Sequence, residues 1–206
     1  MRHGQTDWNV ENRFQGHTDI PLNAVGRAQV ARAASILGTQ DIHHIISSDL
    51  QRAFDTALAV ASVKKLQVTA DQQLRETHCG SWEGRTGPDI EATDGENLSR
   101  WFAGDDIPAG GDGERRSDVV TRMMNSIERE LALCETGQTL LVVTHGGAAR
   151  GAIGALLGLA IGDWVAIGGL ANASWSILEE RNSRWRLVEH NSGVLPEPIL
   201  GQESSQ

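Results

Sequence analysis

Residues 139–149 read TLLVVTHGGAA, and this stretch decides the fold. Its apolar first half predicts a buried parallel strand. The strand ends at His145, two glycines follow, and a helix is expected over residues 148–157. Helix N-termini bind anions because their first N–H groups lack partners and the helix dipole is positive there. The stretch therefore predicts an α/β fold in which an imidazole and free backbone N–H groups meet at one point.

A second histidine–glycine pair stands at the start of the chain, where residues 2–6 read RHGQT. Two histidines, with Arg2 beside one of them, predict a site that handles phosphate through a histidine nucleophile. An arginine and a histidine near the end of an arbitrary chain would be solvated surface residues. The prediction therefore depends on the other motifs of this sequence.

Strands and helices alternate along the rest of the chain. Asn23 is expected to cap a helix over residues 24–37, and Asp49 to cap the next one, over residues 50–63. This alternation predicts a three-layer α/β/α sandwich with a mostly parallel central sheet. The other expected elements are strands over residues 43–47 and 66–70, a helix over residues 118–135, and a hairpin of residues 173–180 and 184–190.

The length of 206 residues suits a single domain, which is expected over residues 1–195. Residues 85–116 contain many Gly, Asp and Pro residues, and we expect them to form an excursion over the mouth of the site, with Trp101 as its anchor. Residues 196–206 are expected to be a disordered tail.

Bulk composition excludes several classes of function. A net charge of −9 argues against nucleic-acid binding, which usually needs a basic face. The two cysteines, Cys79 and Cys134, have no metal-ligand spacing, so we expect no disulfide framework and a cytoplasmic location. Residues 152–170 are apolar but are interrupted by glycines and Asp163. They predict a helix followed by a loop, so no membrane association is expected. No apolar region precedes residues 2–6, so no secretory signal is expected either.

Short blocks that stand in order along the chain are residues 2–6, 13–16, 19–26, 47–57, 74–76, 80–84 and 144–147. Together they resemble the histidine phosphatase (phosphoglycerate mutase-like) superfamily. The resemblance implies the α/β/α fold described above and a small-molecule phosphate ester as the partner; a homodimer is common in the family. Within it, residues 74–78, 167–175 and 184–187 are similar to the glucosyl-3-phosphoglycerate phosphatases.

The resemblance implies a role for each residue of the site. His3 would be the nucleophile, and Glu76 would donate a proton to the leaving oxygen. Arg2 and Arg52 would clamp the phosphoryl oxygens, and a protonated His145 would add positive charge. No metal ion or other cofactor is expected, because these cations already carry the charge.

The same resemblance supplies a set of substrate-binding residues. Two of them, Thr77 and His78, could instead be packing residues. The others match positions that contact the phosphate or follow the second histidine. The full set is Asn9, Gln15, Gly16, Thr77, His78 and Gly146.

The choice between a phosphatase and a mutase depends on the residues after Glu76. Mutases that resemble this chain carry basic residues there to hold a substrate carboxylate, whereas residues 77–81 read THCGS and the next Lys or Arg is Arg85. This favours a phosphatase acting on a phosphoglycerate-type or sugar-phosphoglycerate ester. The alternatives are a mutase, a non-catalytic phospho-ligand binder, and a metal-dependent hydrolase using His3, His78 and His145.

The segment before Arg2 departs from the family pattern. Related proteins carry a short apolar strand before the Arg-His-Gly block, at the centre of the sheet, whereas only Met1 precedes it here. We therefore expect His3 to lie on a disordered terminus and the sheet to lack a central strand. The hypothesis is a mis-assigned start, with a native protein longer by roughly 6–12 residues, about one strand and a lead-in.

Overall fold

The computed structural model describes residues 1–193, so the expected tail of residues 196–206 and the last two residues of the expected domain lie outside the described residues. The centre of the structure is a parallel sheet. In it, β1 (His44–Ser47) lies between β2 (Thr69–Ala70) and β3 (Leu140–Val143). A hairpin of β4 (Trp175–Arg181) and β5 (Arg184–Ser192) forms a second, antiparallel sheet, as the sequence predicted.

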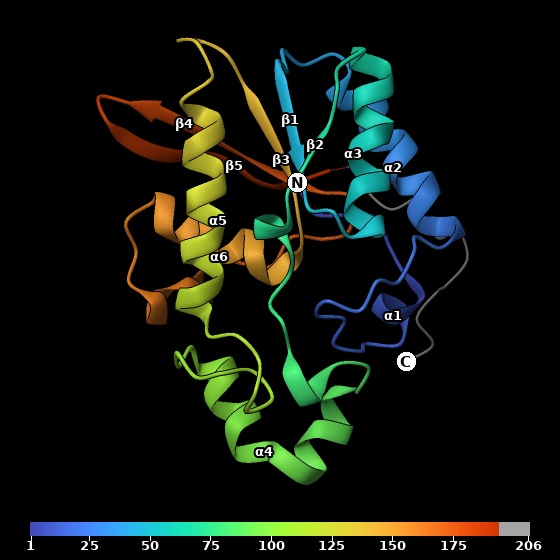
Figure 1. Cartoon of the computed structure of the whole chain (residues 1–206), viewed down its shortest axis with the longest axis vertical. Helices are drawn as coiled ribbons and strands as arrows, with labels where there is room; N and C mark the ends of the chain where they lie inside the picture. Colours follow the sequence, from blue (N-terminus) through green and yellow to red (C-terminus); the bar gives the residue numbers. More distant parts are fainter. Residues whose placement is uncertain (194–206) are drawn as a thin grey trace, which may run out of the picture.

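Helices cover both faces of the parallel sheet (Figure 1). Successive side chains of a strand point to opposite faces. Accordingly, Ile45 packs into a core with one pair of helices and Ile46 into a core with the other pair. The predicted three-layer α/β/α sandwich is therefore confirmed. The first pair is α2 (Ala24–Leu37) and α3 (Gln51–Lys64), and the second is α5 (Arg116–Leu131) and α6 (Gly146–Leu156).

Most of the region expected to form an excursion is the helix α4 (Gly87–Ala103), which extends beyond the end of the sheet (Figure 1). Trp101, near the end of α4, is buried and packs edge-on against Trp82, with ring centroids 6.0 Å apart. The remaining short elements are α1 (Asp7–Val10) and the 3₁₀ helices Gln72–Leu74, Gly80–Trp82 and Ile161–Ala166.

The structure confirms one of the two expected helix caps. The side chain of Asn23 accepts a hydrogen bond of 2.8 Å from the backbone N–H of Gly26, so it caps α2. The expected cap of α3 is wrong, because both carboxylate oxygens of Asp49 are bound by Arg75, at 2.7 and 2.5 Å. Asp19 instead accepts from the first N–H of α3, at 2.8 Å.

The first three residues are ordered between the two sheets. On one side, the backbone N–H of His3 donates to the carbonyl oxygen of Thr144 at 3.1 Å, and the N–H of Thr144 donates to the carbonyl oxygen of Met1 at 2.9 Å. On the other side, the N–H of Arg2 donates to Ser174 at 2.9 Å. The expectation of a disordered terminus is therefore wrong, because this short segment is paired along both edges.

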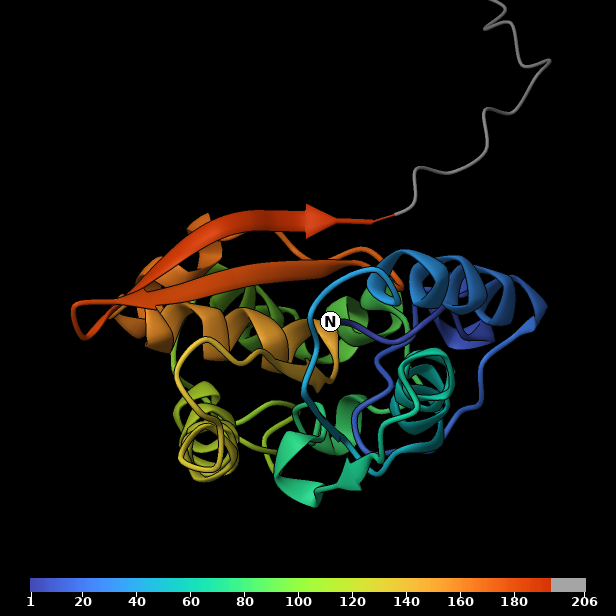
Figure 2. The same cartoon turned by 90° about the horizontal axis from the view of Figure 1, so that it is seen from above.

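Beyond this segment, β3 and β4 face each other across an open groove of about 730 Å³. Among residues 1–193, no strand fills the groove, and Met1–His3 alone bridge the sheets at one end. The hairpin runs over α6 (Figure 2). Apolar side chains of α6 line the groove. No helix in the described part of the chain is long and apolar enough to cross a membrane.

Candidate active site

His3 lies at the end of the segment that joins the two sheets, and only 3% of its surface is exposed. Its Nδ1 atom is 2.6 Å from the carbonyl oxygen of Gly4. Because a carbonyl can only accept, Nδ1 must carry the proton, and Nε2 is left with a free lone pair. Burial lowers the pKa of His3 well below its ordinary value, and the charges of Arg52 and Arg2 lower it further. The ring is therefore a neutral, oriented nucleophile.

His145 follows β3 and is fully buried, with its ring centroid 5.2 Å from that of His3. The Nε–H of Arg52 donates to Nδ1 of His145 at 3.2 Å. A guanidinium has only donors, so Nδ1 must be an acceptor, and Nε2–H donates to Ser48 Oγ at 2.9 Å. Burial and the Arg52 charge also lower the pKa of His145 well below its usual range. The expectation of a protonated His145 is wrong, because this imidazole accepts from a cation.

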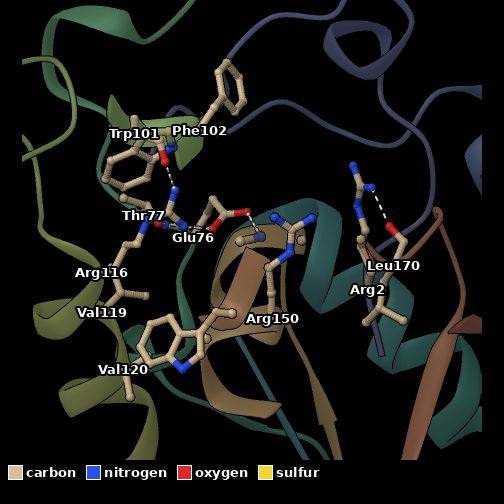
Figure 3. A pocket seen from close by; sticks show the side chains of 15 residues that line it. Arg2, Glu76, Thr77, Trp101, Phe102, Arg116, Val119, Val120, Arg150 and Leu170 are labelled. Atoms are coloured by element: carbon tan, nitrogen blue, oxygen red, sulfur yellow. Dashed lines mark hydrogen bonds between the residues drawn. The ribbon is translucent and has the colours of Figure 1, made fainter. Parts of the chain in front are cut away.

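Two arginines surround the nucleophile. Arg52, on α3, is fully buried, and its Nη1 and Nη2 atoms donate to the carbonyl oxygens of Thr18 and Gly16, each at 2.8 Å. Arg2 donates from Nη1 to the carbonyl oxygen of Leu170 at 2.7 Å (Figure 3). These bonds fix both guanidinium groups, and each retains N–H groups that a phosphoryl oxygen could accept.

The side chain of Glu76 lies at the N-terminus of α6. Its carboxylate accepts hydrogen bonds of 2.9 Å from the backbone N–H groups of Gly147, Ala148 and Thr77. The sequence predicted that the backbone N–H groups at the start of α6 bind an anion. In the structure, they bind the carboxylate of Glu76. The backbone carbonyl of Glu76 is bound by Arg122 at 2.8 Å, so the residue is held at both ends.

One cavity of about 490 Å³ brings most of the expected residues together. Asn9 and Gln15 line it. Asn9 Oδ1 accepts from the backbone N–H of Thr6 at 3.0 Å, and Gln15 Oε1 accepts from Thr6 Oγ1 at 3.1 Å, which leaves the two NH₂ groups as donors for a ligand. Asn172 also lines it, and its NH₂ group donates to the carbonyl oxygen of His3 at 3.2 Å and to Asn9 Oδ1 at 3.1 Å. The predicted residues that line it are Arg2, His3, Asn9, Gln15, Gly16, Arg52, Glu76 and Thr77.

His145 and two of the expected substrate-binding residues take other positions. His145 lies behind the wall, against Arg52. His78 does not line this cavity; its ring packs against His17 with centroids 5.2 Å apart. Gly146 lines the adjoining cavity beside Glu76. Within residues 1–193, no group of three or more His, Cys, Asp or Glu side chains is arranged to hold a metal ion.

Sequence reasoning missed three polar residues near the site. Ser48 supports His145, and Arg116 and Arg150 reach the adjoining cavity from α5 and α6. Arg150 is four positions after Gly146, so the two lie on the same face of α6. That spacing was a signal in the sequence. Nothing in the sequence indicated that α5 would bring Arg116 to the same place.

Known proteins are similar to this chain in sequence and in structure. The family model for the histidine phosphatase superfamily, branch 1, matches residues 1–193. Glucosyl-3-phosphoglycerate phosphatase of Mycobacterium tuberculosis is 38% identical, over 94% of this chain and 93% of its own length. A metal-independent phosphoserine phosphatase of Arabidopsis thaliana is 34% identical, over 94% of this chain and 82% of its own.

A solved structure agrees with these sequence relatives. The structure of a mycobacterial glucosyl-3-phosphoglycerate phosphatase in complex with VO3 superposes with a TM-score of 0.86 at 38% identity. The match covers 93% of this chain and 97% of that one. With a family match along all the described residues and the histidine–arginine–glutamate site in place, the chain belongs to the histidine phosphatase superfamily.

Proposed function

We propose that the chain is a metal-independent phosphomonoesterase that acts through a phosphohistidine at His3. The observation that carries the proposal is the Nδ1–Gly4 hydrogen bond of 2.6 Å, which leaves Nε2 free in a cavity shared with Arg2 and Arg52. A neutral imidazole so placed can attack phosphorus, while two guanidinium groups bind the phosphoryl oxygens.

In the first step, a bond forms between His3 Nε2 and phosphorus as the bond to the leaving oxygen breaks. Glu76, on the wall of the same cavity, acts in this step in its protonated form and gives its proton to that oxygen. In the second step, water attacks phosphorus, Glu76 takes a proton from it, and the nitrogen–phosphorus bond breaks to release inorganic phosphate. The neutral His145 orients Arg52 by accepting from its Nε–H.

The substrate class that we propose is a phosphoglycerate or a sugar-phosphoglycerate. One relative named above is a glucosyl-3-phosphoglycerate phosphatase. The amide groups of Asn9 and Gln15 line a cavity of about 490 Å³ and could donate to the hydroxyl groups of such a substrate. The free thiols of Cys79 and Cys134 suit a reducing compartment, so we keep the cytoplasm as the proposed location. Association into a homodimer also stays a prediction.

The proposal is tested by phosphate release from glucosyl-3-phosphoglycerate, 3-phosphoglycerate and an aryl phosphate, in the presence of a chelator. The wild type is compared with His3→Gln and with His43→Gln, a matched change of an exposed histidine. We expect release in the wild type and in His43→Gln, and none in His3→Gln. Transfer of the phosphoryl group to a second glycerate would instead indicate a mutase, and binding without release would indicate a phospho-ligand binder.

A further inference from the structure

A second cavity, of about 280 Å³, adjoins the catalytic cavity. The two share Arg2, Glu76, Thr77, Trp101 and Gly147 on their walls. Phe102 of α4 also lines the second cavity, and its remaining walls come from α5, α6 and the segment after α6. A ligand whose phosphoryl group lies at His3 could therefore extend into this cavity past Glu76.

Arg150 projects into the second cavity from α6. In the view of Figure 3, its guanidinium group lies between Glu76 on one side and Arg2 on the other. Its Nε atom is buried without a hydrogen-bond partner. Within residues 1–193, its side chain donates no hydrogen bond and forms no ion pair, so its charge is not committed to another part of the protein.

Arg116 reaches the same cavity from the start of α5. Its guanidinium carbon lies 4.1 Å from the centroid of the Trp101 ring, and Nη2 donates to the Trp101 carbonyl oxygen at 2.5 Å. Its Nε atom is also buried without a partner. The stacking and the hydrogen bond fix the plane of the group, and the donors on its other edge are left for a ligand.

The two guanidinium groups are close enough to affect each other. Burial lowers the pKa of Arg116, and the charge of Arg150 lowers it further, whereas Asp106 and Glu76 act in the opposite direction. Neither of these carboxylates is hydrogen-bonded to Arg116 or Arg150; that of Glu76 is bound by the N–H groups of α6. Two like charges facing one small cavity are stabilised by an anion placed between them.

We infer that this cavity is a carboxylate subsite, in which Arg150 and Arg116 bind a carboxylate on the same substrate whose phosphoryl group lies at His3. A carboxylate is favoured over a second phosphate because the cavity, at about 280 Å³, is small. This inference rests on the proposed function, because it assumes that the phosphoryl group binds at His3. It makes Arg150 a specificity-determining residue.

The inference is tested with two ligands that differ only in this group. 3-Phosphoglycerate carries a carboxylate where glycerol 3-phosphate carries a CH₂OH group. Their dissociation constants are measured by calorimetry in His3→Gln, which cannot turn them over, alone and combined with Arg150→Met, Arg150→Lys or Arg184→Met. Arg184 is an exposed arginine of β5 and serves as the matched control.

We expect 3-phosphoglycerate to bind about 10- to 100-fold more tightly than glycerol 3-phosphate, as a charge-assisted pair provides. Arg150→Met should remove this preference, Arg150→Lys should retain part of it, and Arg184→Met should leave it unchanged. Equal binding of the two ligands, or a preference that survives Arg150→Met, overturns the inference. Phosphate release by the wild type is measured in parallel. Preferred binding of the ligand with a carboxylate, without any phosphate release, would contradict only the proposed function. Phosphate release without such a preference would contradict only the carboxylate subsite.

Discussion

The imidazole rings of His3 and His145 lie 5.2 Å apart, and hydrogen bonds hold both of them neutral. The two rings are neutral for different reasons. His3 donates from Nδ1 to a carbonyl, which leaves Nε2 as the nucleophile. His145 accepts from Arg52 at Nδ1, which fixes the guanidinium group beside the phosphoryl position. The positive charge of the site therefore comes from Arg2 and Arg52.

Replacing Glu76 by Gln should slow the enzyme in a way that depends on the leaving group. The amide cannot donate the proton that an alkoxide needs, so turnover of alkyl phosphates should fall by about 10²–10⁴-fold. An aryl phosphate, whose leaving oxygen needs little protonation, should lose only a few-fold in its first step. Burst kinetics on both substrates measure this step. An equal loss of rate on the alkyl and the aryl phosphate would contradict the role of Glu76 as the acid. Glu91→Gln, a change of an exposed residue of α4, is the control.

Replacing Ser48 by Ala should weaken catalysis without removing a group that touches the substrate. Ser48 Oγ accepts from His145 Nε2 at 2.9 Å, and both residues are fully buried. Loss of this bond should lower kcat by about 5- to 10-fold, the effect of one neutral hydrogen bond. Because Arg52 holds the phosphoryl group in both the bound and the transition state, KM should rise as well. Ser62→Ala, an exposed change on α3, should alter neither constant.

The two buried histidines should make the protein less stable at acidic pH. Both have a pKa well below 6.5 in the folded state, whereas in the unfolded chain they titrate near 6.5. As the pH falls below 6.5, the unfolded chain takes up protons that the folded protein cannot, so the free energy of unfolding falls by about 1.4 kcal/mol per pH unit for each histidine.

Urea unfolding between pH 8 and pH 5 measures this effect. The contribution of the two neutral histidines to the free energy of unfolding is fully present above pH 6.5. Below pH 6.5, the free energy of unfolding should decrease steadily. His145→Gln should reduce the slope by about half of the histidine contribution. An unchanged slope in that variant would show that His145 takes up a proton in the folded protein.

The sequence was sufficient for the elements whose determinants are local. The apolar run that ends at His145 predicted β3 and α6, and Asn23 predicted the start of α2, because strand burial and helix capping are encoded within a few residues. Asp49 was misassigned because a competing partner, Arg75, lies 26 positions away along the chain. Local patterns do not reveal such tertiary competition.

The same limit explains what was missed in the site. The charge state of His145 depends on Arg52 Nε, a donor from another helix, and the pairing of Arg116 with Arg150 depends on how α5 packs against α6. The argument against a mutase considered only the residues directly after Glu76, and the structure supplies basic groups to that cavity from elsewhere. The motifs predicted the catalytic residues but not the surroundings that set their charge.

The central claim is that phosphate passes through His3. The most direct test is to mix the enzyme with substrate for milliseconds, quench it in alkali, and map the phosphate by mass spectrometry. We predict an acid-labile, alkali-stable phosphoryl group on His3 that decays as inorganic phosphate appears, and none on His3→Gln. Continued release of phosphate by His3→Gln, with no phosphohistidine in the wild type, would contradict the account.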